Sequence, residues 1–70
     1  MKQNVRKNLV SLRKKRGLTQ TETAAQLGIC VRQYKSLEAG TSNGSVRVWI
    51  QLKRLLHAKS IDWLLEQSED

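Results

Sequence analysis

The sequence contains no proline, one cysteine, three aromatic residues and no long run of apolar residues. Without a long apolar run, we expect neither a transmembrane helix nor a secretory signal segment. A single cysteine cannot form an internal disulfide, so we expect a protein of the reducing cytoplasm. Runs of β-branched residues with period two are also missing, whereas leucine is abundant. Together these features predict an all-α fold.

Acidic residues are scarce, because six Asp and Glu stand against 13 Lys and Arg, which gives a net charge of +7. The excess lies in residues 1–35, which hold nine bases and one acid, whereas residues 36–70 hold four bases and five acids. A compact domain with one cationic half suggests a polyanionic partner, either nucleic acid or an anionic membrane. With 70 residues we expect a single domain with its core at 5–66, an acidic tail at 67–70, and no room for a separate catalytic or sensor domain.

The periodicity of the apolar residues predicts five short helices. The first begins at a cap on Asn4 and runs to about Arg16, because Val5, Leu9 and Leu12 share one helical face. Three further helices are expected at 20–27, 31–39 and 46–56, and a short fifth after residue 60. The expected N-caps are Thr19, which forms a capping box with Glu22, and Ser45 and Ser60.

The connection between the helices at 20–27 and 31–39 is only three residues long, from Gly28 to Cys30. So tight a connection forces the two helices to cross steeply, and the small Ala24 permits their close approach. This arrangement predicts a helix-turn-helix. If Tyr34 and Leu37 of the second helix face the core, its other side faces outward and is open to a partner.

Residues 12–20 read LRKKRGLTQ, and Ala24, the 27–29 turn, residues 37–40 and residues 60–65 follow as further blocks. In this order and register, the blocks resemble those of the lambda-repressor-like, Cro/XRE family of DNA-binding domains. The resemblance covers about residues 5–66. It implies a compact five-helix, lambda-repressor-like all-α domain whose third helix enters the major groove, and homodimers that bind double-stranded DNA at pseudo-palindromic operators.

The sequence departs from the family pattern at three places. Thr23 stands where a larger aliphatic residue is usual, and Cys30 replaces the usual Ser or Thr cap. The loop after Gly40 lacks the common proline and its basic residues. These departures bear on affinity and on loop contacts rather than on the fold.

The residues expected to contact DNA fall into two groups. Arg32 suits a bidentate contact with guanine, and Val31 suits a thymine methyl group. The expected base contacts are Val31, Arg32, Lys35 and Ser36. The expected backbone contacts, by residue type or by the resemblance, are Thr19, Gln20, Gln33, Thr41, Ser42, Asn43 and Arg47. Lys2, Arg6 and Lys7 either reach flanking phosphates or form a solvated basic face.

Two further sets of residues are assigned structural roles. The resemblance implies a partly buried ion pair between Arg13 and Glu38, which would orient the third helix rather than contact phosphate. Dimer contacts are expected from the acid-richer C-terminal part, with Trp63 mostly in the core. This contact should be small, so that the homodimer is weak in solution and assembles on DNA. The expected dimer contacts are Lys59, Ser60, Ile61 and Leu64.

No catalytic or metal-binding pattern is visible. Cys30 and His57 are far apart and lack acidic neighbours, so we expect no metal, no cofactor and no enzymatic activity. We expect a small transcriptional repressor that acts by occupying its operator. The alternative is an antitoxin or adaptor of the same fold that binds a protein such as a toxin. A membrane-surface helix is disfavoured, because the basic run at 14–16 has no exposed aromatic face behind it.

Overall fold

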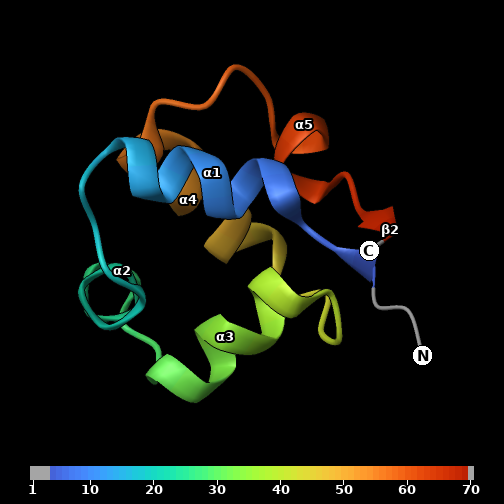
Figure 1. The fold of residues 1–70 in the computed structure, drawn as a ribbon. Coiled ribbons are helices and arrows are strands. Elements are labelled where there is room, and N and C mark those ends of the chain that lie inside the picture. The colour runs from blue at the N-terminus through green and yellow to red at the C-terminus, as the bar shows by residue number, and fades with distance from the viewer. Residues whose placement is uncertain (1–3, 70) are drawn as a thin grey trace.

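The computed structural model describes residues 4–69, which form five helices (Figure 1). The helices are α1 (Lys7–Lys15), α2 (Gln20–Leu27), α3 (Val31–Ala39), α4 (Val46–Leu56) and α5 (Ile61–Leu65). Their Cα atoms have a radius of gyration of 10.9 Å, as expected for one small compact body. The predicted all-α, five-helix fold is confirmed.

Two short strands join the ends of the described chain. β1 (Asn4–Val5) pairs antiparallel with β2 (Ser68–Glu69), so that Asn4 faces Glu69 and Val5 faces Ser68. The prediction that Asn4 caps the first helix is therefore wrong, because the strand pairing holds residues 4 and 5 extended and α1 begins only at Lys7. Ser68 and Glu69, which were expected in an acidic tail, lie in β2.

Local capping fixes the bounds of the other helices. The Thr19 hydroxyl oxygen accepts a hydrogen bond from the Glu22 backbone N–H at 3.0 Å, and the Glu22 carboxylate accepts one from the Thr19 N–H at 2.9 Å. Ser45 and Ser60 cap α4 and α5 in the same way. Gly28 ends α2 with φ +73, a conformation that glycine adopts without steric cost. The predicted capping box and the other two caps are thus confirmed.

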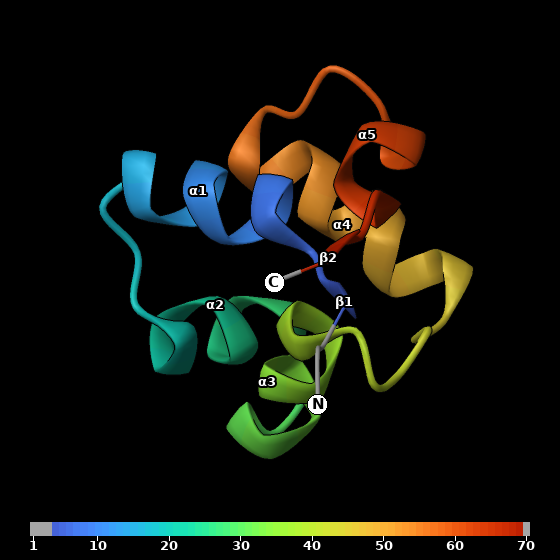
Figure 2. The ribbon, with the colours of Figure 1, turned by 45° about the vertical axis from the view of Figure 1, so that its right-hand side comes forward.

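The core lies between two layers of helices. In both views α2 and α3 form one layer, and α1, α4 and α5 form the other (Figures 1 and 2). Each helix contributes at least one buried apolar side chain, and burial of this kind is the main force that stabilises a small domain. The buried apolar residues are Leu9, Leu12, Ala24, Leu27, Tyr34, Leu37, Trp49, Leu52, Leu56 and Leu64. This packing leaves the outer side of α3 at the edge of the molecule.

Candidate nucleic-acid interface

The α2–turn–α3 unit has the tight geometry that the sequence predicted. Ala24 is 2% exposed, which lets the two helices approach closely, and the Ile29 N–H donates to the Ala24 carbonyl at 3.1 Å. Cys30 occupies the N-cap of α3 with an exposed side chain, and its N–H donates to the side-chain oxygen of Gln33 at 3.4 Å. The turn is therefore held by backbone hydrogen bonds, and the direction of α3 relative to α2 is fixed.

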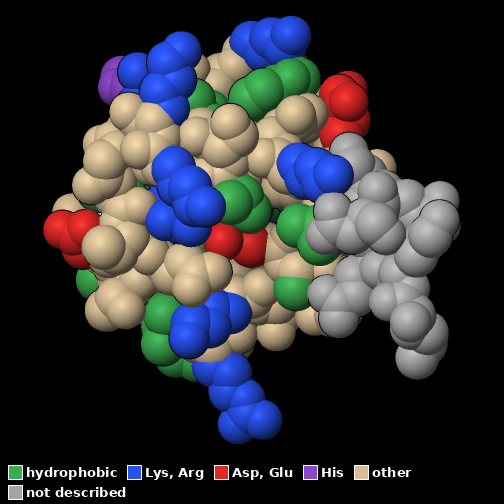
Figure 3. All heavy atoms as spheres, in the orientation of Figure 1, with side chains coloured by type: hydrophobic (Ala, Val, Ile, Leu, Met, Phe, Trp, Pro, Cys, Tyr) green, Lys and Arg blue, Asp and Glu red, His purple; other side chains and the backbone are tan. Residues whose placement is uncertain are grey.

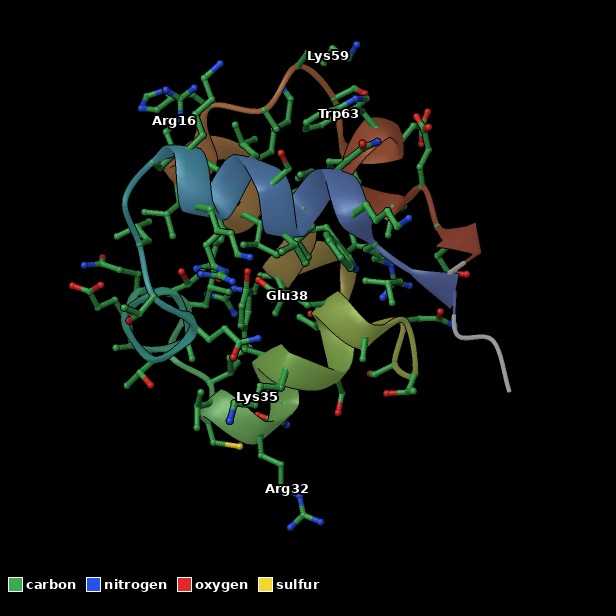
Figure 4. All side chains as sticks on the ribbon, viewed as in Figure 1. Arg16, Arg32, Lys35, Glu38, Lys59 and Trp63 are labelled. Carbon is green, nitrogen blue, oxygen red and sulfur yellow. The ribbon has the colours of Figure 1, made fainter. Side chains whose placement is uncertain are left out.

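The two sides of α3 differ in character. Tyr34 and Leu37 are buried in the core, whereas Arg32 and Lys35 are exposed, and Arg32 points away from the domain (Figure 4). Val31 is half-buried and packs at the edge of the core. The outer side of α3 thus offers two long cations that no other helix covers.

Ser36 shares the exposed side of α3 but is half-buried, and its hydroxyl donates to the Arg32 carbonyl at 3.2 Å. Its oxygen is left as an acceptor. The four residues expected to contact bases therefore comprise two exposed cations and two partly covered small side chains.

The residues expected to contact the DNA backbone lie at the start of α2, in α3, in the loop before α4 and in the first turn of α4. Thr19, Gln33, Thr41, Asn43 and Arg47 are exposed. A hollow between α3 and the start of α4 brings several polar groups together, and its lining includes Gln33, Ser36, Ser42 and Ser45. Gln20 and Ser42 are half-buried, and Gln20 is engaged with a carboxylate beneath it.

That carboxylate belongs to Glu38, which is 4% exposed and forms the centre of a buried network. Its Oε2 accepts hydrogen bonds from Arg13 Nε at 2.5 Å and from the Tyr34 hydroxyl at 2.6 Å. Its Oε1 accepts from Gln20 Nε2 at 2.8 Å. Arg13 and Glu38 therefore form a buried ion pair that links α1 to α3, and the Gln20 hydrogen bond adds α2.

The protonation states in this network follow from its geometry. Burial raises the pKa of Tyr34, and the hydrogen bond to Glu38 and the charge of that carboxylate raise it further, so the phenol stays protonated. Burial alone would lower the pKa of Arg13, but the hydrogen bond and charge of Glu38 outweigh it and raise the pKa. A fixed cation, a fixed anion and a neutral donor thus hold α3 in place.

The expectation that Arg6 is a surface cation is wrong. Arg6 was expected to reach phosphate or to lie on a solvated face, but it is 3% exposed and contacts the end of α3 and the loop that follows. Its place one helical turn before the buried Leu9 was the available signal in the sequence. Lys7 is exposed as expected, and Lys2 lies outside the described residues.

The expected dimer contacts are only partly available. Leu64 is 0% exposed, so it has no surface to offer a second subunit, and its assignment as a dimer contact is wrong. Lys59 is exposed with its Nζ 5.5 Å from the centre of the Trp63 ring, and the Ser60 hydroxyl caps α5. Ile61 is half-buried against the core.

The cations are spread over the surface rather than gathered in one place. Lys and Arg side chains protrude at the lower edge, where α3 lies, and also at the upper end of the molecule (Figure 3). Among the described side chains, no group of three or more His, Cys, Asp or Glu is placed to hold a metal ion. Within residues 4–69, no helix is both long and apolar enough to span a bilayer.

Comparison with known proteins identifies the family of this fold. The model of the helix-turn-helix family matches residues 9–64, which include all of α2 and α3 and the turn between them. Searches of the curated proteins and of the solved structures gave no match. The matched family is one of DNA-binding domains. The chain therefore belongs to the lambda-repressor-like, Cro/XRE type of helix-turn-helix family, and it is a DNA-binding regulator.

Proposed function

We propose that the protein binds a specific double-stranded DNA sequence through α3 in the major groove, and that it represses transcription by occupying an operator. The observation that carries the proposal is the two-sided character of α3. Tyr34 and Leu37 anchor the helix in the core, while Arg32 and Lys35 project from its uncovered side. An α-helix fits the major groove, where each base pair presents a distinct pattern of donors and acceptors.

Each side chain on this face has a chemically suited target. Arg32 offers a planar fork of donors that matches the O6 and N7 acceptors of guanine. Lys35 can donate to a base edge or to a phosphate, and Val31 can contact a thymine methyl group with the part of its side chain that is not packed on the core. Ser36 retains its oxygen as an acceptor for a base amino group.

The backbone contacts would come from two places beside α3. The first N–H groups of α2 have no partner within the helix and favour an anion. Glu38 holds one amide hydrogen of Gln20, which leaves the second for a phosphate oxygen. On the other side, Thr41, Ser42 and Asn43 of the loop, with Gln33 and Arg47 nearby, would reach the next phosphates along the groove.

We further propose that two copies bind a pseudo-palindromic site, because one recognition helix reads only a few base pairs. Half-sites would then lie about 34 Å apart, one turn of DNA. Lys59, Ser60 and Ile61 remain candidates for the contact between subunits, and the small surface they offer would leave the dimer weak without DNA. Sedimentation with one half-site, and with two half-sites at varied spacing, tests this model. Tight binding to an isolated half-site would contradict it.

The function itself is tested by selecting bound sites from random duplex DNA and titrating binding with salt. Affinity should fall linearly on logarithmic axes as salt rises. Arg32→Ala should lose base preference at one position of each half-site, a loss of about 1–3 kcal/mol or about 5- to 150-fold. Protein that selects no DNA at any salt concentration would instead indicate a protein-binding module, such as an antitoxin or adaptor.

Arg54→Ala is the matched control for that variant. Arg54 is an exposed arginine in the last turn of α4. Arg16 marks the position of this turn, because its Nε donates to the Leu56 carbonyl at 2.8 Å. Figure 4 shows Arg16 on the opposite side of the domain from Arg32. The control should keep its base preference. Unchanged affinity and preference in Arg32→Ala would mean that α3 does not read the sequence.

A further inference from the structure

The loop between α3 and α4, residues 40–45, contains no basic residue to draw it toward DNA. Its polar groups bind a phosphate more tightly if the loop already holds one conformation, because ordering a flexible loop on binding costs free energy. Arg6, at the start of α1, anchors this loop by hydrogen bonds.

Arg6 bonds to both the recognition helix and the loop. Its Nη1 donates to the Leu37 carbonyl and to the Ser42 carbonyl, each at 2.7 Å, so a single nitrogen joins the last turn of α3 to the loop. Its Nη2 donates to Asn43 Oδ1 at 3.4 Å. Its backbone N–H adds a fourth bond, to the Glu38 carbonyl at 3.0 Å.

Trp49 also holds the loop. Its indole Nε1 donates to the Asn43 carbonyl at 2.5 Å, and the Arg6 guanidinium carbon lies 5.1 Å from the centre of its ring, a cation–π distance. Gly44 then passes through a narrow gap, because a Cβ built on it would lie 2.7 Å from a methyl carbon of Leu37. Arg6, Trp49 and Gly44 together leave the loop little freedom.

The chemistry of Arg6 also orients the side chain of Asn43. An arginine has only donors, so the Asn43 amide oxygen must face it. The amide nitrogen is then free of this contact, and it is a donor of the kind that a phosphate oxygen accepts. The carbonyl oxygens of Leu37 and Ser42 and the Trp49 ring lie against the charge of Arg6. Burial lowers the pKa of Arg6.

We propose that Arg6 is a positioning residue for DNA binding: it holds the loop so that Thr41, Ser42 and Asn43 meet the phosphate beside the bases that α3 reads. This inference rests on the proposed function. Arg6 itself does not contact DNA, since it is 3% exposed. Lysine could not replace it, because a compact ammonium group lacks the planar fork that spans Leu37, Ser42 and Asn43.

The test is phosphate-ethylation interference on a duplex selected with the wild-type protein. Arg6→Met should abolish interference at the phosphate that the loop contacts and keep interference at the phosphate beside the start of α2. The salt slope should change little, because the neutral groups of the loop release no counterion when they bind a phosphate. Base preference at the position read by Arg32 should stay, and Arg6→Lys should behave like Arg6→Met. Arg54→Met is the control and should leave the pattern unchanged. A merely structural role would lower the active fraction of protein without altering the interference pattern, and that result would overturn the proposal.

A second variant keeps the test independent of the stability of Arg6→Met. Asn43→Asp retains an acceptor for Arg6, removes the amide donor and adds a negative charge that repels phosphate, so it should fold and lose interference at the same phosphate. Loop-phosphate interference that persists in both Asn43→Asp and Arg6→Met would overturn the role of Arg6 while the proposed function stands. A wild-type protein that gives no sequence-specific interference would contradict the proposed function itself, and the role of Arg6 with it.

Discussion

Replacing Glu38 by alanine should strongly destabilise the fold, because it leaves the cation of Arg13 in a buried site without its anion. Glu38 is 4% exposed and Arg13 is 7% exposed. The substitution also removes the acceptor of the Tyr34 hydroxyl and of the Gln20 amide. Breaking one side of a buried ion pair costs about 3–5 kcal/mol.

That loss is large beside the total stability of so small a domain. A 70-residue domain has a free energy of unfolding of about 3.5–10 kcal/mol. At about 4–8 °C per kcal/mol, Glu38→Ala should lower the melting temperature by at least about 12 °C. Urea unfolding followed by the fluorescence of the buried Trp49 gives the free energy directly, and the midpoint should fall with little change in slope.

The double variant Arg13→Met/Glu38→Leu separates the ion pair from general packing effects. With both charges gone no buried charge is stranded, so the double variant should be more stable than the sum of the two single losses predicts. Strictly additive losses would refute a coupled pair. A Glu38→Ala protein that melts like the wild type and binds DNA more tightly would show that Glu38 is an ordinary surface acid that repels phosphate.

Three further changes probe the fold at defined points. Tyr34→Phe should lower the free energy of unfolding by about 1.5–3 kcal/mol, because it removes a hydrogen bond to a carboxylate. Because the pKa of Tyr34 is raised in the fold, the phenol ionises first in the unfolded chain, so wild-type stability should fall above about pH 10. Urea unfolding at pH 8 and pH 10.5 should show a smaller fall in the variant. Glu22→Gln should weaken the loss of melting temperature at acid pH. The backbone hydrogen bond from Thr19 lowers the pKa of Glu22, so the carboxylate stabilises the fold above about pH 4.3 and ceases to do so as the pH falls through the lowered value. Equal melting temperatures of variant and wild type from pH 7 to pH 3 would contradict this. Gly44→Ala should lower the melting temperature more than Gly17→Ala does. Both glycines have positive φ, but only a Cβ at Gly44 would meet neighbouring atoms. Equal losses of melting temperature would show that the loop around Gly44 moves to make room for the methyl group.

The sequence predicted best the features that neighbouring residues determine. The bounds of α2, α3 and α4 agree with the structure because each of these helices has a local stop signal or cap, such as Thr19 with Glu22, or Gly28. The orientation of α3 followed from Tyr34 and Leu37, which share one helical face. Periodicity and capping depend on residues close together in the chain, so they can be predicted from a single sequence.

Contacts between distant parts of the chain were missed for a physical reason. β1 and β2 are two residues each, which is too short to leave an alternating pattern, and they join opposite ends of the chain. Arg6 bonds to backbone carbonyls, which every residue possesses, so no partner residue type marks its site. Leu64 was misassigned because a leucine on a five-residue helix looks the same whether it faces the core or a second subunit.

The central claim, that α3 reads bases through Arg32, is tested most directly by a cycle between protein and DNA. In the selected operator, the guanine assigned to Arg32 is replaced by an analogue that lacks the N7 acceptor, and affinity is measured for the wild type and for Arg32→Ala. The account predicts that the analogue weakens wild-type binding about 5-fold or more and leaves Arg32→Ala binding unchanged, because the lost acceptor has no partner there. An equal loss for both proteins at every guanine of the operator would contradict it.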